Sequence, residues 1–149
     1  MIKSIIIEDE VNGLKNLKNL LEKYCQNVDV IGEATNISQG YELLKDPSKQ
    51  PDVAFLDINL PDGLVFQLLN QLKGQINFDI IFVTAYEKFA VKACQYSSIG
   101  FIIKPIDPDE LKEAVNRVRI GRNNKISQRL EVFNQHYNNP NAFEKMSIS

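Results

Sequence analysis

A short apolar run that ends in an acid, "DVAFLDINLPDG" at residues 52–63, is the stretch from which the fold can be predicted. Four consecutive apolar residues precede Asp57, which is typical of a strand buried on both faces of a parallel sheet. The Leu-Pro-Asp-Gly sequence that follows has the composition of a turn. We therefore predict a strand over 52–58 that carries the Asp57 carboxylate to its own carboxyl end.

Similar apolar runs alternate with stretches of helical periodicity along the chain. Strands are predicted over 3–9, 28–34, 52–58, 79–85 and 100–105, and helices over 11–24, 38–45, 64–73 and 87–96. A long last helix is predicted to begin at Pro108, with a pattern that Val118, Arg119 and Arg122 carry on. Asp107 is the expected N-cap of the last helix, with Pro108 at its first position. Strands that alternate with helices indicate a parallel sheet covered on both faces, and right-handed crossovers favour a doubly wound α/β sheet of five strands in the order 2-1-3-4-5.

Composition excludes several classes of protein. The chain has 149 residues, 44% hydrophobic and 24% charged, which is enough for one globular domain. No apolar run approaches the roughly 20 residues of a membrane helix, and the acidic start "MIKSIIIEDE" is no secretory signal, so we expect a cytoplasmic protein without a membrane partner. Cys25 and Cys94 form no motif and are predicted to be buried free thiols.

Polar side chains gather where four of the predicted strands end. Glu8 and Asp9 follow the first strand, Asp57 ends the third, Thr84 the fourth and Lys104 the fifth. In a doubly wound sheet, ligands bind beyond the carboxyl ends of the strands, and the order 2-1-3-4-5 makes these four strands neighbours. We therefore expect the five side chains to meet at one rim.

Such a set suits phosphoryl chemistry. Three adjacent carboxylates need a cation, and all-oxygen ligands suit Mg²⁺. A carboxylate can also attack phosphorus to give an aspartyl phosphate, whose new negative charge a metal ion, a Lys ammonium and a hydroxyl donor would stabilise. Lys104 and Thr84 supply the last two, and the small Ala85 leaves room for the phosphoryl group.

At these positions the sequence resembles the receiver domain of bacterial two-component response regulators, over about residues 3–121. The motifs are Glu8-Asp9, Asp57 with "LPDG" behind it, Thr84-Ala85 and Lys104-Pro105. The resemblance implies that Asp57 accepts a phosphoryl group from a sensor histidine kinase, with Mg²⁺ required. It also implies that Asp9 and Asp57 touch the metal directly, that Glu8 acts on it mostly through water, and that the backbone carbonyl of Asn59 adds a ligand. The domain is expected to catalyse only its own phosphorylation and dephosphorylation, without other enzyme activity.

The resemblance also implies a switch. Thr84 moves toward the phosphoryl group, and the aromatic ring of Phe101 turns inward into the space that Thr84 leaves. The Lys104-Pro105 peptide resembles the cis peptide of the family. Asn59 and Tyr86, which flank the site, are expected to tune the lifetime of the phosphorylated form.

The block "YEKFAVKAC…GFIIKPID" resembles regulators whose output is a LytTR-type (LytR/AlgR-like) DNA-binding domain. Residues 1–121 are then the receiver domain, 122–139 an extended last helix and linker, and 140–149 the start of a DNA-binding domain that is not in this chain. DNA would be bound only through that domain; the excess of basic residues in 111–149 is too small to predict DNA binding by this chain. A homodimer on phosphorylation is expected, through either the face of the fourth and fifth helices or the last helix.

Four alternatives stay open at this point. A phospho-switched interaction module without DNA output shares every motif above. A pseudo-receiver would lack an acid or the lysine. A phosphatase of the haloacid dehalogenase kind needs a second Asp where this chain has Asn59, because that Asp is the general acid and base. A flavodoxin-like cofactor binder needs a phosphate-binding loop after the first strand, where this chain is acidic.

Overall fold

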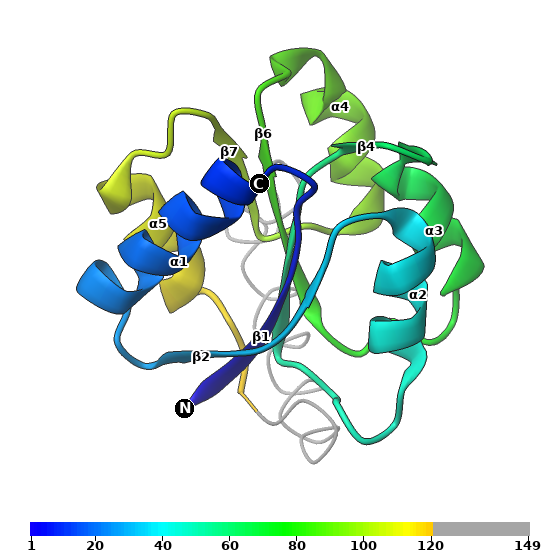
Figure 1. Ribbon diagram of the computed structural model, residues 1–149, viewed down its shortest axis with the longest axis horizontal. Helices are drawn as coiled ribbons and strands as arrows, with labels where there is room; N and C mark the ends of the chain where they lie inside the picture. Colours follow the sequence, from blue (N-terminus) through cyan, green and yellow to red (C-terminus); the bar gives the residue numbers. More distant parts are fainter. Residues whose placement is uncertain (121–149) are drawn as a thin grey trace, which may run out of the picture.

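The computed structural model describes residues 1–120 as a five-stranded sheet between two layers of helices (Figure 1). The strands are β1 (Ile2–Ile7), β2 (Val28–Ala34), β3 (Val53–Leu56), β6 (Asp79–Thr84) and β7 (Gly100–Ile103), and two short strands, β4 (Asn59–Leu60) and β5 (Gly63–Leu64), form a separate hairpin. The helices are α1 (Val11–Tyr24), α2 (Ile37–Lys45), α3 (Val65–Gln71), α4 (Ala90–Ala93) and α5 (Pro108–Asn116).

The order of the main sheet confirms the prediction. Its strands run β2-β1-β3-β6-β7, and all four pairings are parallel. All four residues of β3 are buried, because helices cover the sheet on both sides. The carboxyl ends of β1, β3, β6 and β7 therefore lie next to one another, as the site requires.

The two faces of the sheet carry separate hydrophobic cores. On one face α1 and α5 pack on the sheet, and on the other face α2, α3 and α4 do (Figure 1). Leu17, Leu21, Leu111 and Val115 are the main helix residues of the first core. Phe66 and Leu68 of α3 belong to the second core, where both are at most 2% exposed. The carboxyl ends of the strands are therefore supported by a packed core on each face of the sheet.

The turn after Asp57 is more ordered than the sequence indicates. Asn59 pairs with Leu64 and Leu60 with Gly63, so that Leu-Pro-Asp-Gly closes a small antiparallel hairpin. Strands of two residues show no periodicity, which is why no pattern predicts them. Gly63 has φ 138°, a conformation that favours glycine, so the sequence of the turn is matched to its backbone.

The predicted helix over 87–96 is only partly confirmed. Residues 90–93 are α-helical, and a 3-10 turn lies on each side, η1 (Glu87–Phe89) and η2 (Cys94–Tyr96). Each turn carries an aromatic side chain that packs on Phe66, with ring centroids 6.1 Å away for Phe89 and 5.1 Å for Tyr96. The prediction that Cys94 is buried is wrong: Cys94 lies in η2 and is exposed, whereas Cys25 is buried as expected.

The last described helix begins as predicted and ends sooner. Asp107 is its N-cap and accepts a hydrogen bond from the Asp109 N–H at 3.0 Å, with Pro108 in the first position. The prediction that the helix continues through Val118 and Arg119 is wrong, because α5 ends at Asn116 and residues 117–120 are not helical. The buried Asp79 carboxylate accepts a hydrogen bond from the Arg119 N–H at 2.9 Å, which holds this segment against the sheet instead. The predicted segments 122–139 and 140–149 lie outside the described residues.

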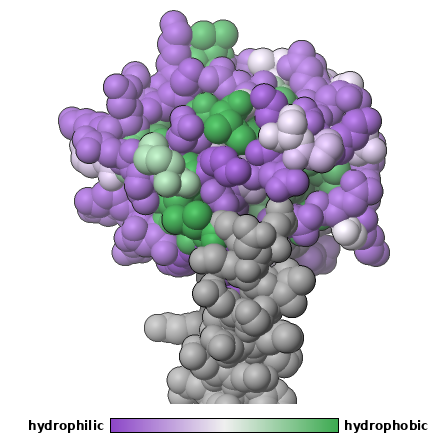
Figure 2. Space-filling view, turned by 90° about the horizontal axis from the view of Figure 1, so that it is seen from below, coloured by the Kyte–Doolittle hydropathy of each residue, from purple (hydrophilic) through white to green (hydrophobic). Residues whose placement is uncertain are grey.

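Within residues 1–120 no helix is both long enough and apolar enough to cross a membrane. The end of the molecule that lies at the bottom of Figure 1 is mainly hydrophilic, with small hydrophobic patches separated by polar residues (Figure 2).

Candidate functional site

The rim is built by backbone hydrogen bonds that extend the sheet one residue beyond its strands. The N–H of Glu8 donates to the carbonyl of Ala34 at 3.0 Å, and the N–H of Asp57 donates to Ile7 at 2.9 Å. The N–H of Lys104 donates to Thr84 at 2.8 Å. These bonds fix the backbone from which three of the predicted site residues extend their side chains.

The three predicted acids do meet. Carboxylate oxygens of Glu8, Asp9 and Asp57 lie within 4.8 Å of one another. Glu8 is only 5% exposed and Asp57 only 7%, whereas Asp9 is the more open of the three. The cluster is therefore a half-enclosed acidic pocket whose outer side faces solvent.

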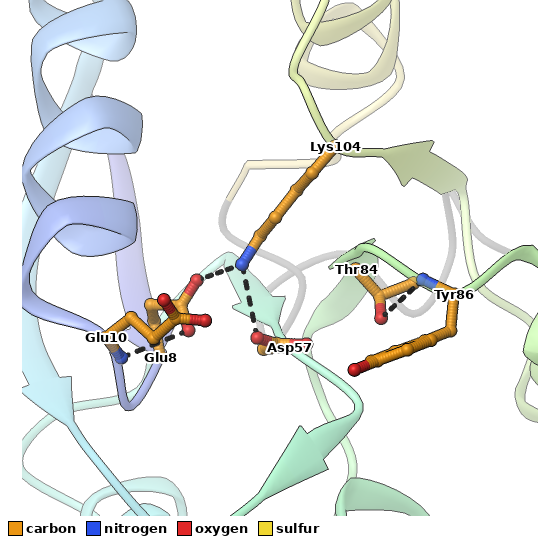
Figure 3. A network of polar contacts seen from close by, with 6 residues as sticks. All are labelled: Glu8, Glu10, Asp57, Thr84, Tyr86 and Lys104. Atoms are coloured by element: carbon orange, nitrogen blue, oxygen red, sulfur yellow. Dashed lines mark hydrogen bonds and ion pairs between the residues drawn. The ribbon is translucent and has the colours of Figure 1, made fainter.

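Lys104 compensates the charge of the two buried acids. Its side chain reaches from the end of β7 to a position between Glu8 and Asp57 (Figure 3). Lys104 Nζ donates to Glu8 Oε1 in a short contact and to Asp57 Oδ2 at 3.2 Å. The lysine thus holds the acids together by charge-assisted hydrogen bonds.

Burial nonetheless controls the protonation of Glu8. Loss of solvent raises the pKa of Glu8 from 4.5 to about 7, although its hydrogen bond with Lys104 acts in the opposite direction. Burial alone would lower the pKa of Lys104, but its contacts with Glu8 and Asp57 outweigh burial and raise that pKa above 10.5. The pocket therefore holds a charged lysine beside an acid that is partly protonated at neutral pH.

The pocket fits a hard divalent cation. All of its charged ligand atoms are carboxylate oxygens, the type that Mg²⁺ prefers, and Lys104 forms ion pairs with only two of the three acids, Glu8 and Asp57. A dication would replace the repulsion that remains among the carboxylates with attraction. Glu8, Asp9 and Asp57 are the residues that would hold it.

The predicted switch residues lie on the other side of Asp57. Thr84 is fully buried, and its hydroxyl accepts a hydrogen bond from the Tyr86 N–H at 3.3 Å (Figure 3). Ala85 is exposed beside it. Phe101 is half-buried and packs against Phe82, with ring centroids 6.2 Å apart.

The remaining predicted residues also border the rim. Asn59 is exposed at the start of β4, two residues after Asp57. Tyr86 is 45% exposed and meets the ring of Phe89 edge-on, with centroids 6.3 Å apart. The peptide bond between Lys104 and Pro105 is cis.

Two residues near the site were not predicted from the sequence. Asp62, in the turn of the β4–β5 hairpin, accepts hydrogen bonds from the N–H groups of Ile37 and Ser38 at the start of α2. Its partners are about 25 positions away in the chain, so no local pattern shows the contact. Gly13 lies in the first turn of α1 against the Glu8 carboxylate. A glycine inside a helix was the only signal for it.

Comparisons with known proteins agree with this geometry. Residues 5–116 match the model of the response regulator receiver domain. The sensory transduction protein LytT of Bacillus anthracis is 32% identical over 89% of this chain and 53% of its own length. The transcriptional regulatory protein BtsR of Escherichia coli is 30% identical over 80% of this chain and 48% of its own length. The chain thus spans about half the length of these curated relatives.

Solved structures show the same fold. The response regulatory domain of protein mrkE from Klebsiella pneumoniae matches with a TM-score of 0.70 at 23% identity, over 83% of this chain and 99% of that chain. The receiver domain of the response regulator NarL from Mycobacterium tuberculosis matches with a TM-score of 0.67 at 23% identity, over 77% and 93%. With the family match over residues 5–116 and the acidic rim in place, the chain belongs to the response regulator receiver domains.

Proposed function

We propose that Asp57 accepts a phosphoryl group from a sensor histidine kinase and that Mg²⁺ is required for the transfer. The observation that carries the proposal is the buried Asp57 carboxylate, held 3.2 Å from the Lys104 ammonium and within 4.8 Å of two further acids. Asp57 also lies between the Glu8–Lys104 pair and Thr84, so a group bound to it would be within reach of both sides of the rim (Figure 3).

The transfer is a displacement at phosphorus. An Asp57 oxygen forms the new O–P bond as the N–P bond of a kinase phosphohistidine breaks, and the imidazole leaves with the electron pair. Lys104 then stabilises the added negative charge, and Thr84 gives up the Tyr86 N–H to donate its own hydroxyl proton to a phosphoryl oxygen. Glu8, Asp9, Asp57 and the carbonyl of Asn59 would hold Mg²⁺, which when bound supplies positive charge to the phosphoryl oxygens.

The same step drives the switch. When Thr84 shifts toward the phosphoryl group, the ring of Phe101 turns inward into the space that Thr84 leaves, and the surface formed by α4, β7 and α5 changes. Asn59 and Tyr86 border the path of attacking water and set the lifetime of the phosphorylated form. Hydrolysis of that aspartyl phosphate is the only other reaction expected of the domain.

The proposal is tested by intact mass. Acetyl phosphate with Mg²⁺ should add about 80 Da, one phosphoryl group, and chelation of the metal should prevent the addition. Asp57→Asn should show no adduct, while Asp29→Asn, which changes an exposed aspartate on β2, should keep it. An adduct that survives in Asp57→Asn, or sustained turnover of phosphate esters by the wild type, would contradict the assignment.

The output we propose is a LytTR-type DNA-binding domain that follows this chain. Support comes from the likeness to LytT and BtsR, both about twice as long as the matched region. Reading the gene beyond Ser149 is the test, since a basic, β-rich segment of about 100 residues is expected. A stop codon at that point would favour the alternative, a phospho-switched interaction module that binds a partner protein.

A further inference from the structure

Gly13 touches the metal pocket although it lies on a helix behind the rim. A Cβ atom at this position would lie 2.6 Å from Glu8 Oε1 and 3.0 Å from Glu8 Cδ. The third nearest heavy atom is Glu8 Cγ, at 3.4 Å, so all of the closest atoms belong to Glu8. Glu8 is therefore what excludes a side chain at position 13.

The backbone gives no other reason for a glycine there. Gly13 is the third residue of α1, and the positive φ values of the described residues are at Gln50, Gly63, Gly74 and Ser97. A helical position without positive φ accepts alanine, which is the better helix former. The reason for a glycine at position 13 is therefore the contact with Glu8.

The neighbour is a long acid in a confined place. Glu8 Oε1 is held by Lys104, and Glu8 Oε2 accepts a hydrogen bond from the Glu10 N–H at 3.4 Å. The side chain must fold over the start of α1 to make both contacts, and the surface of Gly13 is the space that it uses. An aspartate at position 8 would be one methylene group shorter, so its carboxylate would reach less far over Gly13 than the Glu8 carboxylate does.

We infer that Gly13 is a positioning residue for the metal pocket, because the missing side chain is what allows the longer Glu8 carboxylate to stand beside Asp57 and Lys104. A methyl group at position 13 would push the end of this flexible side chain away and leave the helix backbone in place. Its effect should thus fall on the pocket more than on the fold. The inference rests on the proposed Mg²⁺ site.

A double-mutant cycle tests the coupling. Four proteins are compared: wild type, Gly13→Ala, Glu8→Asp and the double variant. Mg²⁺ dissociation constants are measured by NMR titration of backbone amides, and thermal unfolding is followed in EDTA. Asn16→Ala, at an exposed position of α1, controls for the gain in helix propensity.

Gly13→Ala should weaken Mg²⁺ binding about tenfold when Glu8 is present, the lower end of the cost of changing residues that support metal ligands. In the Glu8→Asp background the same change should alter binding by less than about twofold, and Asn16→Ala should alter it in neither background. In EDTA, Gly13→Ala should raise the unfolding temperature more in the Glu8→Asp background than in the wild type.

The Mg²⁺ titrations decide between the outcomes. Equal losses of affinity in the two backgrounds, or no loss in either, would overturn the role of Gly13 while leaving the metal site intact. A wild type that binds no Mg²⁺ would overturn both the inference and the metal part of the proposed function.

Discussion

Glu8 is an acid of the pocket whose charge changes with pH in the neutral range. Its pKa of about 7 lies well above its value of 4.5 in an unfolded chain, because burial disfavours the carboxylate. The folded state thus binds more protons than the unfolded state between these two values. The stability that this group contributes is present below pH 4.5 and is lost as the pH rises through 7.

The metal-free protein should therefore become less stable as the pH rises from about 5 to about 8, while Mg²⁺ should bind more tightly over the same range because it requires the carboxylate. Thermal unfolding with EDTA and with Mg²⁺ at several pH values measures both trends. Glu8→Gln, which cannot titrate, should remove most of the pH dependence. A wild type whose metal-free stability does not fall between about pH 6 and 8, and whose pH dependence is the same as that of Glu8→Gln, would contradict the raised pKa of Glu8.

At the same scale, the sequence predicts which residues meet at the rim of the sheet but not the side-chain contacts that fix each of them there. The ends of the strands place Glu8, Asp57 and Lys104 at one rim because parallel strands all point the same way. That Lys104 contacts both acids depends on side-chain directions that no spacing encodes. The space over Gly13 likewise depends on how the chain turns between β1 and α1.

At the scale of elements, the β4–β5 hairpin is joined to α2 by Asp62. The carboxylate accepts hydrogen bonds from Ile37 N at 2.8 Å and from Ser38 N at 3.2 Å, and these contacts lower its pKa. Asn36 caps the same helix from within, accepting from Gln39 N at 2.8 Å. Two caps on one helix end allow a matched comparison, since only Asp62 belongs to the loop that follows Asp57.

Asp62→Ala and Asn36→Ala should each lower stability by about 1 kcal/mol, the usual cost of losing a helix cap. Only Asp62→Ala should also weaken Mg²⁺ binding, because it releases the hairpin that carries Asn59. Urea unfolding and Mg²⁺ titration of the two variants make the comparison. Equal Mg²⁺ affinities would mean that the hairpin holds its shape without the contact to α2.

The helices show where periodicity predicts well and where it does not. α1 and α2 lie within one residue of their predicted bounds, because apolar residues recur along one face and turns flank them. Around α4 the periodicity correctly indicates helical structure, but it does not predict the 3-10 turns on either side of the α-helix. Those turns carry Phe89 and Tyr96, whose packing on Phe66 is a tertiary contact. α5 ends at Asn116, and the segment after it is held by Asp79, which is 40 positions before its partner Arg119 and so outside any local pattern.

At the scale of the whole molecule, the structure shows that few residues of the expected dimer face are free to contact a partner. Of the apolar residues in and beside α4, Phe89 and Tyr96 are packed on the core, and Val91 is 81% exposed. Arg117 donates from Nη1 to the carbonyl of Ile99 at 2.8 Å, and the backbone of Arg119 is bound to Asp79. Val91 is therefore the apolar side chain of this face that a second copy of the chain would contact most directly.

Beryllofluoride with Mg²⁺, a mimic of the phosphoryl group, should convert the protein to a dimer in analytical ultracentrifugation. Val91→Glu should keep it monomeric, because a buried charge without a partner opposes association. Asn19→Glu adds the same charge at an exposed position of α1, on the opposite layer, and should still dimerise. A Val91→Glu protein that dimerises like the wild type would move the interface elsewhere, toward the segment after residue 121.

The contact between Lys104 and Glu8 can form only late in the synthesis of the chain. The two residues are 96 positions apart, and the acids that follow β1 and β3 leave the ribosome long before the lysine does. Until then, the growing chain carries a carboxylate cluster without its counter-charge, and β6 lacks its neighbour β7. Nascent chains that end before residue 104 should accordingly be more open to proteases than longer ones, and dissolved Mg²⁺ should protect them by standing in for the lysine not yet synthesised.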